Sequence, residues 1–137
     1  MSALTITLLQ TNLIWEDPVA NRAMLDEKIS QVDPATQLLI LPEMFSSGFS
    51  MDPERLAETM QGPTMEWMRQ TAVKHRMILT GSLIIREEEN FFNRLLWVLP
   101  DGSYGYYDKR HLFAFAGEDK KYSPGKRRLI ASVNGWR

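Results

Sequence analysis

Two charged side chains follow predicted β-strands and have the chemistry for proton transfer and for stabilising negative charge. Glu43 comes directly after the apolar run 38–41 and Pro42, where a carboxylate can project into the crevice at the edge of a sheet and act as a general base. Lys109 follows the predicted strand 104–108, and its ammonium could stabilise an oxyanion, an effect typically worth about 3–4 kcal/mol. Either residue on its own could equally be a solvated surface group.

The elements before Glu43 predict an alternating strand-helix-strand order. Residues 4–9 alternate and then become apolar, which is typical of a first strand, and residues 38–41 form a short apolar run that predicts a strand covered on both faces. Between them, Asp17-Pro18 can begin a helix, with apolar residues at helical spacing until Asp33-Pro34 ends it. Glu43 is therefore expected where a buried strand stops.

The remainder predicts a second helix and an antiparallel meander. The segment 44–63 is expected to be a long loop, and Thr64 to cap a helix whose buried stripe contains Met65, Met68, Ala72 and His75. Residues 77–85 and 91–99 predict a hairpin with the charged tip 86–90, followed by the strand 104–108 and another at 128–133. The fold class is expected to be α/β.

Composition limits the classes of function. The chain has 137 residues and a net charge of -1, from 16 basic and 17 acidic residues spread along it, so nucleic acid and membrane surfaces are not expected partners. It contains no cysteine, which excludes disulfides, thiolate metal sites and a thiol nucleophile within this chain. We find no secretory signal and no membrane-spanning run, so a cytoplasmic location is expected.

Several motifs in register resemble the nitrilase superfamily of carbon-nitrogen hydrolases. They are the segment 38–43 (Leu-Leu-Ile-Leu-Pro-Glu), the segment 107–113 (Tyr-Asp-Lys-Arg-His-Leu-Phe), and Glu118 ahead of Ser-Pro-Gly at 123–125. The segment 42–51 is particularly similar to the bacterial omega-amidase branch, which deaminates 2-oxoglutaramate and related monoamides of dicarboxylic acids. The resemblance extends over all 137 residues.

The resemblance implies a role for each motif residue. Glu43 would be the general base, Lys109 the oxyanion donor, and Glu118 the second glutamate, although a shift of one residue would select Asp119 instead. Phe45 and Phe49 lie beside the expected base and could form part of the pocket wall for a small-molecule amide substrate. The family chemistry requires no metal and no organic cofactor.

The resemblance also implies a larger architecture than this chain supplies. Family members adopt a four-layer α-β-β-α sandwich and usually pair as dimers, and a cysteine attacks the amide carbon. We therefore expect residues 1–137 to be the N-terminal half of such a domain, to lack amidase turnover alone, and to associate as a homodimer or with a cysteine-bearing half.

Two alternatives remain from the sequence. The same side chains could serve nitrile or N-carbamoyl hydrolysis, which the residues after the nucleophile would distinguish. The chain could also be a non-catalytic fragment or interaction module, which the lack of cysteine favours, whereas the presence of Glu43, Lys109 and Glu118 together favours descent from a working enzyme.

Overall fold

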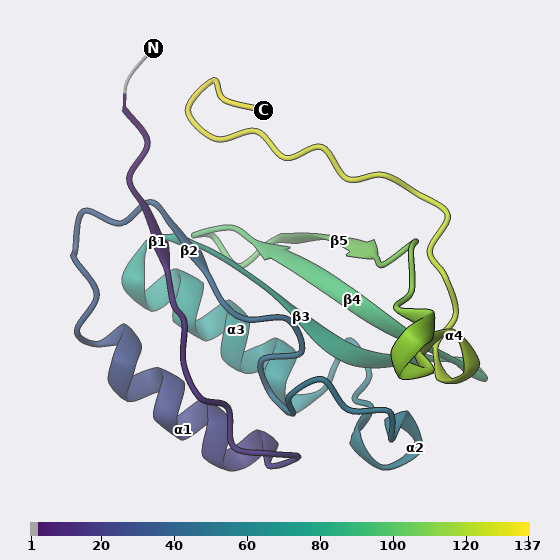
Figure 1. The fold of residues 1–137 in the computed structure, drawn as a ribbon. Coiled ribbons are helices and arrows are strands. Elements are labelled where there is room, and N and C mark those ends of the chain that lie inside the picture. Colours follow the sequence, from purple (N-terminus) through teal and green to yellow (C-terminus); the bar gives the residue numbers. More distant parts are fainter. Residues whose placement is uncertain (1–2) are drawn as a thin grey trace.

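A single mixed sheet organises the chain, and its strands follow one another in sequence order across the sheet (Figure 1). The structure is a computed structural model that describes residues 3–137. The first three strands are parallel and the last two antiparallel: β1 (Ile6–Leu8), β2 (Leu38–Ile40), β3 (Ile78–Glu87), β4 (Asn90–Val98) and β5 (Tyr104–Asp108). The predicted α/β class is confirmed.

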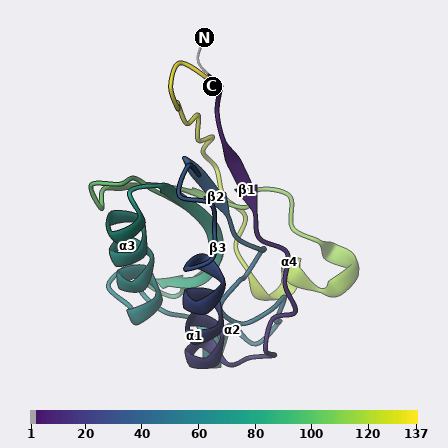
Figure 2. The same cartoon turned by 90° about the vertical axis from the view of Figure 1, so that its left-hand side faces the viewer.

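Two long helices cover one face of the sheet, α1 (Pro18–Ile29) and α3 (Pro63–His75). Figure 2 shows both on one side of the strands, with the short α4 (Glu118–Lys121) on the other. The Asp17 side chain accepts a hydrogen bond from the Ala20 N–H and so begins α1 as predicted. The helix ends earlier than expected, at Ile29, and Val32 lies beyond it.

The start of α3 differs from the prediction that Thr64 caps it. The helix begins at Pro63, and the Glu58 carboxylate accepts the Thr64 N–H at 2.8 Å. A side chain from the preceding loop thus satisfies a free amide of the first turn, which the sequence spacing did not indicate. That loop also contains the short helix α2 (Pro53–Leu56). On α3 the predicted stripe of Met65, Met68 and Ala72 is buried, whereas His75 is half-buried.

The main core lies between this helical layer and the sheet. Leu39, Leu79 and Leu96 are fully buried there, opposite Leu25 of α1 and Met68 of α3. The strand register explains why these leucines share the core, because Leu79 and Leu96 point to the same face from neighbouring strands. Burial of these apolar side chains is the main force that holds the helices on the sheet.

The hairpin is longer than predicted. The β3–β4 ladder continues to the pair Glu87 and Asn90, so only Glu88 and Glu89 form the turn. Glu88 adopts a left-handed conformation with φ of 54°. No helix within residues 3–137 has the length and apolar character needed to cross a bilayer.

The C-terminal segment 124–137 crosses the other face of the sheet as an extended chain (Figure 1). The strand predicted at 128–133 does not form; the only ladder contact there is one bridge between Val133 and Trp136. An apolar sequence becomes a strand only when a neighbour pairs with its backbone, and within residues 3–137 no strand is hydrogen-bonded along this segment.

Candidate active site

Glu43 is held by a tight turn that follows β2. Met44 has φ of 47°, in the left-handed region, and its N–H donates to Ser82 Oγ at 2.8 Å. The Gly48 N–H closes the turn on the Met44 carbonyl at 2.8 Å. Met44 is fully buried, while half of the Glu43 side chain is exposed. The turn therefore anchors Met44 in the fold and leaves the Glu43 carboxylate accessible.

Lys109 directly follows β5, and its backbone is bound on both sides. Its N–H donates to the Asn93 carbonyl at 2.9 Å, and its own carbonyl accepts the Gly125 N–H at 3.0 Å. A Cβ at position 125 would lie 2.0 Å from the Asp108 carbonyl oxygen, far inside the closest non-bonded contact of a side-chain carbon. Only glycine therefore allows the C-terminal segment to approach Lys109 this closely.

Glu118 is the first residue of α4, and its side chain is fully buried. Its Oε2 accepts the Phe113 N–H at 2.6 Å and lies 2.9 Å from Lys109 Nζ. Asp119, the alternative from the sequence, is exposed. The structure thus brings Glu118 to Lys109 and leaves its neighbour in solvent.

The ammonium of Lys109 lies between the two carboxylates. Its Nζ is 2.8 Å from Glu43 Oε1 and 2.9 Å from Glu118 Oε2, and the Phe49 ring centre is 5.2 Å away. Burial on its own would lower the Lys109 pKa, but the hydrogen bonds with the two glutamates outweigh it and raise the pKa above its ordinary value. The lysine is therefore a fixed positive charge at neutral pH.

The charge of Glu118 is stabilised in the same way. Burial raises the pKa of its carboxyl, but the hydrogen bonds from the Phe113 N–H, Asn93 and Lys109 together outweigh burial and bring the pKa below its usual range. Its negative charge holds the ammonium in place from the buried side. Glu43 meets the same ammonium from the accessible side.

A cavity of about 290 Å³ opens beside this cluster on the sheet face opposite α1 and α3. It is lined by Leu41, Glu43, Gly81, Ser82, Asn93, Leu95, Tyr107 and Lys109. Both an accessible carboxylate and an ammonium thus border one mainly apolar space large enough for a small organic molecule.

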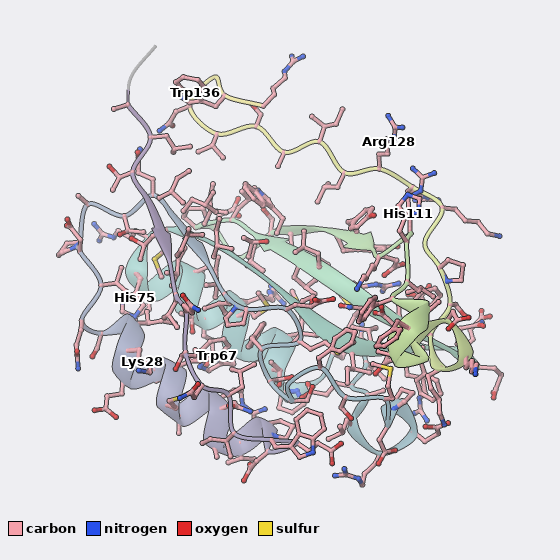
Figure 3. The ribbon with its side chains drawn as sticks, in the orientation of Figure 1. Lys28, Trp67, His75, His111, Arg128 and Trp136 are labelled. Atoms are coloured by element: carbon pink, nitrogen blue, oxygen red, sulfur yellow. The ribbon has the colours of Figure 1, made fainter. Side chains whose placement is uncertain are left out.

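The two predicted wall residues lie in different places. Phe49 is half-buried and its ring faces the Lys109 ammonium, but it is not among the residues that line the cavity, so its role in the pocket wall stays a prediction. Phe45 is a correction: it is fully buried in the helix-side core, and its ring centre lies 5.6 Å from that of Trp67. Phe45 lies on the helix side of the sheet, in the same core as Leu39 and Leu41, where Figure 3 labels Trp67.

Asn93 is the site residue that the sequence interpretation missed. Its Nδ2 donates to Glu43 Oε1 at 2.8 Å and to Glu118 Oε1 at 3.0 Å. It lies inside a strand, between Phe92 and Arg94, and shares its face with Leu95 and Tyr107. A polar residue in the buried centre of a predicted strand was the available signal, because such a group needs internal partners.

His111 lies away from the charged cluster. It is exposed and lines a second cavity together with Arg128 of the C-terminal segment; Figure 3 shows these two residues near each other. Among residues 3–137 no group of three or more His, Cys, Asp or Glu side chains is placed to hold a metal ion.

This arrangement combines an accessible proton acceptor with a fixed cation. A half-exposed carboxylate beside an apolar cavity can take a proton from a bound group, and an ammonium on the same cavity can stabilise an oxygen that becomes negative. Covalent attack would require a nucleophile, and the sequence supplies no thiol.

Known proteins share both the sequence and the fold of this chain. The sequence profile described as carbon-nitrogen hydrolase matches residues 5–133. An omega-amidase, YafV, from Yersinia enterocolitica is 41% identical and matches 100% of this chain but 53% of its own length; YafV from Escherichia coli strain K12 is 37% identical with the same coverage.

A solved structure of a CN-hydrolase superfamily protein from Xanthomonas campestris, with an arsenic adduct in its active site, superposes with a TM-score of 0.95 at 43% identity. The superposition covers 99% of this chain and 51% of the Xanthomonas protein. An amidase from Nesterenkonia sp. AN1 shares the fold with a TM-score of 0.83, at 20% identity, over 98% of this chain and 53% of its own. The chain spans about half the length of the relatives it matches. By its sequence profile and by its relatives, this chain belongs to the carbon-nitrogen hydrolase family.

Proposed function

We propose that this chain is the N-terminal half of a carbon-nitrogen hydrolase domain and contributes the general base and the oxyanion donor to an omega-amidase. The observation that carries the proposal is the contact of Glu43 and Glu118 with one ammonium, that of Lys109, beside an accessible cavity. The assembled enzyme, meaning this chain with a cysteine-bearing half, would hydrolyse the terminal amide of a dicarboxylic acid monoamide such as 2-oxoglutaramate.

In this mechanism Glu43 takes the proton of the cysteine thiol, and the thiolate attacks the amide carbonyl carbon. The carbonyl oxygen becomes negative, and the Lys109 ammonium, 2.8 Å from the base, stabilises it. Protonated Glu43 gives this proton to the leaving nitrogen, so that the tetrahedral intermediate expels ammonia and forms the thioester. A water molecule then gives a proton to Glu43 and attacks the thioester carbon; the acid product leaves, and Glu43 returns the proton to sulfur and restores the thiol.

The substrate class is supported by the relatives rather than by the cavity. Two proteins called omega-amidase are 41% and 37% identical to this chain over its whole length. The cavity is compatible with a small amide, because Leu41 and Leu95 offer apolar contact beside the two charged groups.

The proposal includes a partner for the sheet face opposite the helices. Leu95, Trp97 and Tyr107 are only half-buried on that face, beneath the extended C-terminal segment. We propose that the cysteine-bearing half, or a second copy of the chain, covers it, and that the assembled enzyme works in the cytoplasm.

Fragment complementation tests this function. The chain is co-expressed with the part of the Yersinia enterocolitica omega-amidase that lies beyond the matched region, and also joined to it as one polypeptide. Ammonia release from 2-oxoglutaramate is then measured. We expect turnover from the assembled enzyme and none from the chain alone, and a loss of about 100-fold or more in kcat for Glu43→Gln and for Lys109→Met.

Two comparisons make the result specific. The matching N-terminal part of the Yersinia protein serves as the positive control for assembly. Asp119→Asn, beside Glu118 but exposed, is expected to leave kcat unchanged. Full turnover by the Glu43→Gln assembly, or by the purified chain alone, would disprove the assignment.

A further inference from the structure

Asn93 contacts every charged member of the site. Its backbone carbonyl accepts the Lys109 N–H at 2.9 Å, and its side-chain Nδ2 donates to Glu43 at 2.8 Å and to Glu118 at 3.0 Å. It lies in the middle of β4 and is 2% exposed. No other residue in the described part of the chain is hydrogen-bonded to both glutamates and, through its backbone, to Lys109.

We propose that Asn93 is the positioning residue of the site: its amide group fixes the two carboxylates on either side of the Lys109 ammonium and orients Glu43 for proton transfer. Both bonds to the base end on Glu43 Oε1, one from Asn93 and one from Lys109. The other oxygen, Oε2, is then the one that takes a proton. The catalytic part of this inference rests on the proposed function; the positioning itself is a property of this chain.

A lysine alone does not fix the plane of a carboxylate. The last torsion of a glutamate side chain is broad, and an ammonium is a compact charge on a flexible stem that attracts the carboxylate from many directions. Asn93 has a short side chain on a rigid central strand, so its second bond to Glu43 Oε1 removes that freedom.

The two carboxylates also need a hydrogen-bond donor besides Lys109. Two carboxylates share the single ammonium of Lys109, each within 2.9 Å of Nζ. The neutral amide of Asn93 supplies two more N–H bonds, one to each carboxylate, without adding charge. Neither alanine nor leucine donates a hydrogen bond, and aspartate would bring a third carboxylate to the cluster.

Side-chain NMR titration of the full chain tests the proposal. Asn93→Leu removes both donors and keeps the side chain near its original size. We expect the Glu118 titration midpoint to rise by about one pH unit, because the carboxylate loses a donor while it stays buried, and the Lys109 ammonium protons to exchange faster with water. Asp101, whose carboxylate is bound by Ser103 in an exposed turn, should titrate unchanged and is the internal reference.

Val98→Ala is the matched control on the same strand. Val98 is fully buried in the helix-side core, so its truncation should lower stability without moving the Glu118 midpoint. Asn93→Ala is the second variant if Asn93→Leu does not fold. An unchanged Glu118 midpoint in a folded Asn93 variant, or an equal shift in Val98→Ala, would overturn the proposal. So would failure of both Asn93 variants to fold while Val98→Ala folds, since Asn93 would then serve the scaffold.

The assembled enzyme adds a second measurement. In metal sites, mutation of a residue that only orients a ligand usually lowers activity by about 10- to 100-fold. Asn93 orients Glu43 in a comparable way, so we expect a similar loss in kcat for Asn93→Leu, with KM within about twofold of wild type. An unchanged kcat would overturn the catalytic part. An inactive wild-type assembly would instead count against the proposed function, and the titration would still decide the positioning role.

Discussion

The two faces of the sheet are stabilised in different ways. On the helix side, Leu79, Leu83 and Leu96 are at most 1% exposed and pack against α1 and α3. Each contributes through the amount of apolar surface it removes from water, and no directed bond is needed.

The opposite face carries polar groups at corresponding positions of the same strands. Thr80, Ser82 and Asn93 are nearly buried there and hydrogen-bonded, while Leu95 and Tyr107 are only half-buried. The positions of the side chains on this face therefore depend on specific hydrogen-bond donors and acceptors. One strand can thus support the scaffold with one set of residues and the site with the alternate set.

The largest expected effect tests the scaffold side. Leu79→Ala should lower the free energy of unfolding by about 3 kcal/mol, because it leaves a cavity in a fully packed core. Leu95 lies on the opposite face of the sheet and is already only half-buried. Leu95→Ala should therefore lower the free energy of unfolding by only about 1 kcal/mol. Urea denaturation of both variants measures the difference. Equal losses would show that the two faces do not differ in packing.

Gly125→Ala tests the backbone contact that supports the site side. The new Cβ would overlap the Asp108 carbonyl, so the C-terminal segment must move away from Lys109, at a cost of about 2 kcal/mol. Gly105→Ala is the control, because its Cβ would meet only Leu129 at 3.4 Å. Thermal unfolding measures both. A Gly125→Ala chain as stable as wild type would contradict the close approach.

Glu118→Gln tests the charge on the site side and should cost about 1.5 kcal/mol at pH 7. The Glu118 pKa is lowered in the fold, so the unfolded chain takes up this proton first as the pH falls. Its stabilising contribution is therefore complete well above pH 4.5, the ordinary value, and is lost below it. Glu89→Gln in the exposed hairpin turn controls for one lost charge. We expect wild type and Glu118→Gln to converge in stability in acid; a constant difference would contradict this.

The smallest effect should come from a charge pair that belongs to neither face. Lys121 Nζ and Glu54 Oε1 are 3.5 Å apart, and their side chains are 44% and 59% exposed. Water screens such a pair, so a double-mutant cycle of Lys121→Ala and Glu54→Ala should give a coupling below about 0.5 kcal/mol. A larger coupling would mean that surface charge, too, holds α4 against α2.

The sequence was sufficient for those parts that depend on local pattern. The strand ends that carry Glu43 and Lys109 follow from apolar runs and a proline, and Asp17-Pro18 marks the start of α1 correctly. The proximity of Glu43 to Lys109 depends on the order of strands across the sheet. In the sequence analysis that proximity came from resemblance to a family, not from periodicity.

The remaining differences have tertiary causes. Phe45 was expected at the pocket because it is close to Glu43 in the sequence, but it packs in the helix-side core together with Leu39 and Leu41. Residues 128–133 have strand-like composition, but no strand within residues 3–137 pairs with their backbone. Asn93 was overlooked because it lies within a run that predicts only a strand, and its partners are 25 and 50 residues away in the sequence.

The turn at Met44 places opposing demands on one position. Its φ of 47° favours glycine or asparagine, whereas its complete burial favours a large apolar side chain. A side chain branched at Cβ would add strain at this φ. Valine and isoleucine are therefore apolar enough for the buried site but do not suit its backbone conformation. A saturation library at position 44 should therefore accept very few substitutions, with unbranched leucine ahead of the small and polar residues. The position of the Glu43 carboxylate would then depend on a fully buried neighbour that is among the least replaceable residues of the chain.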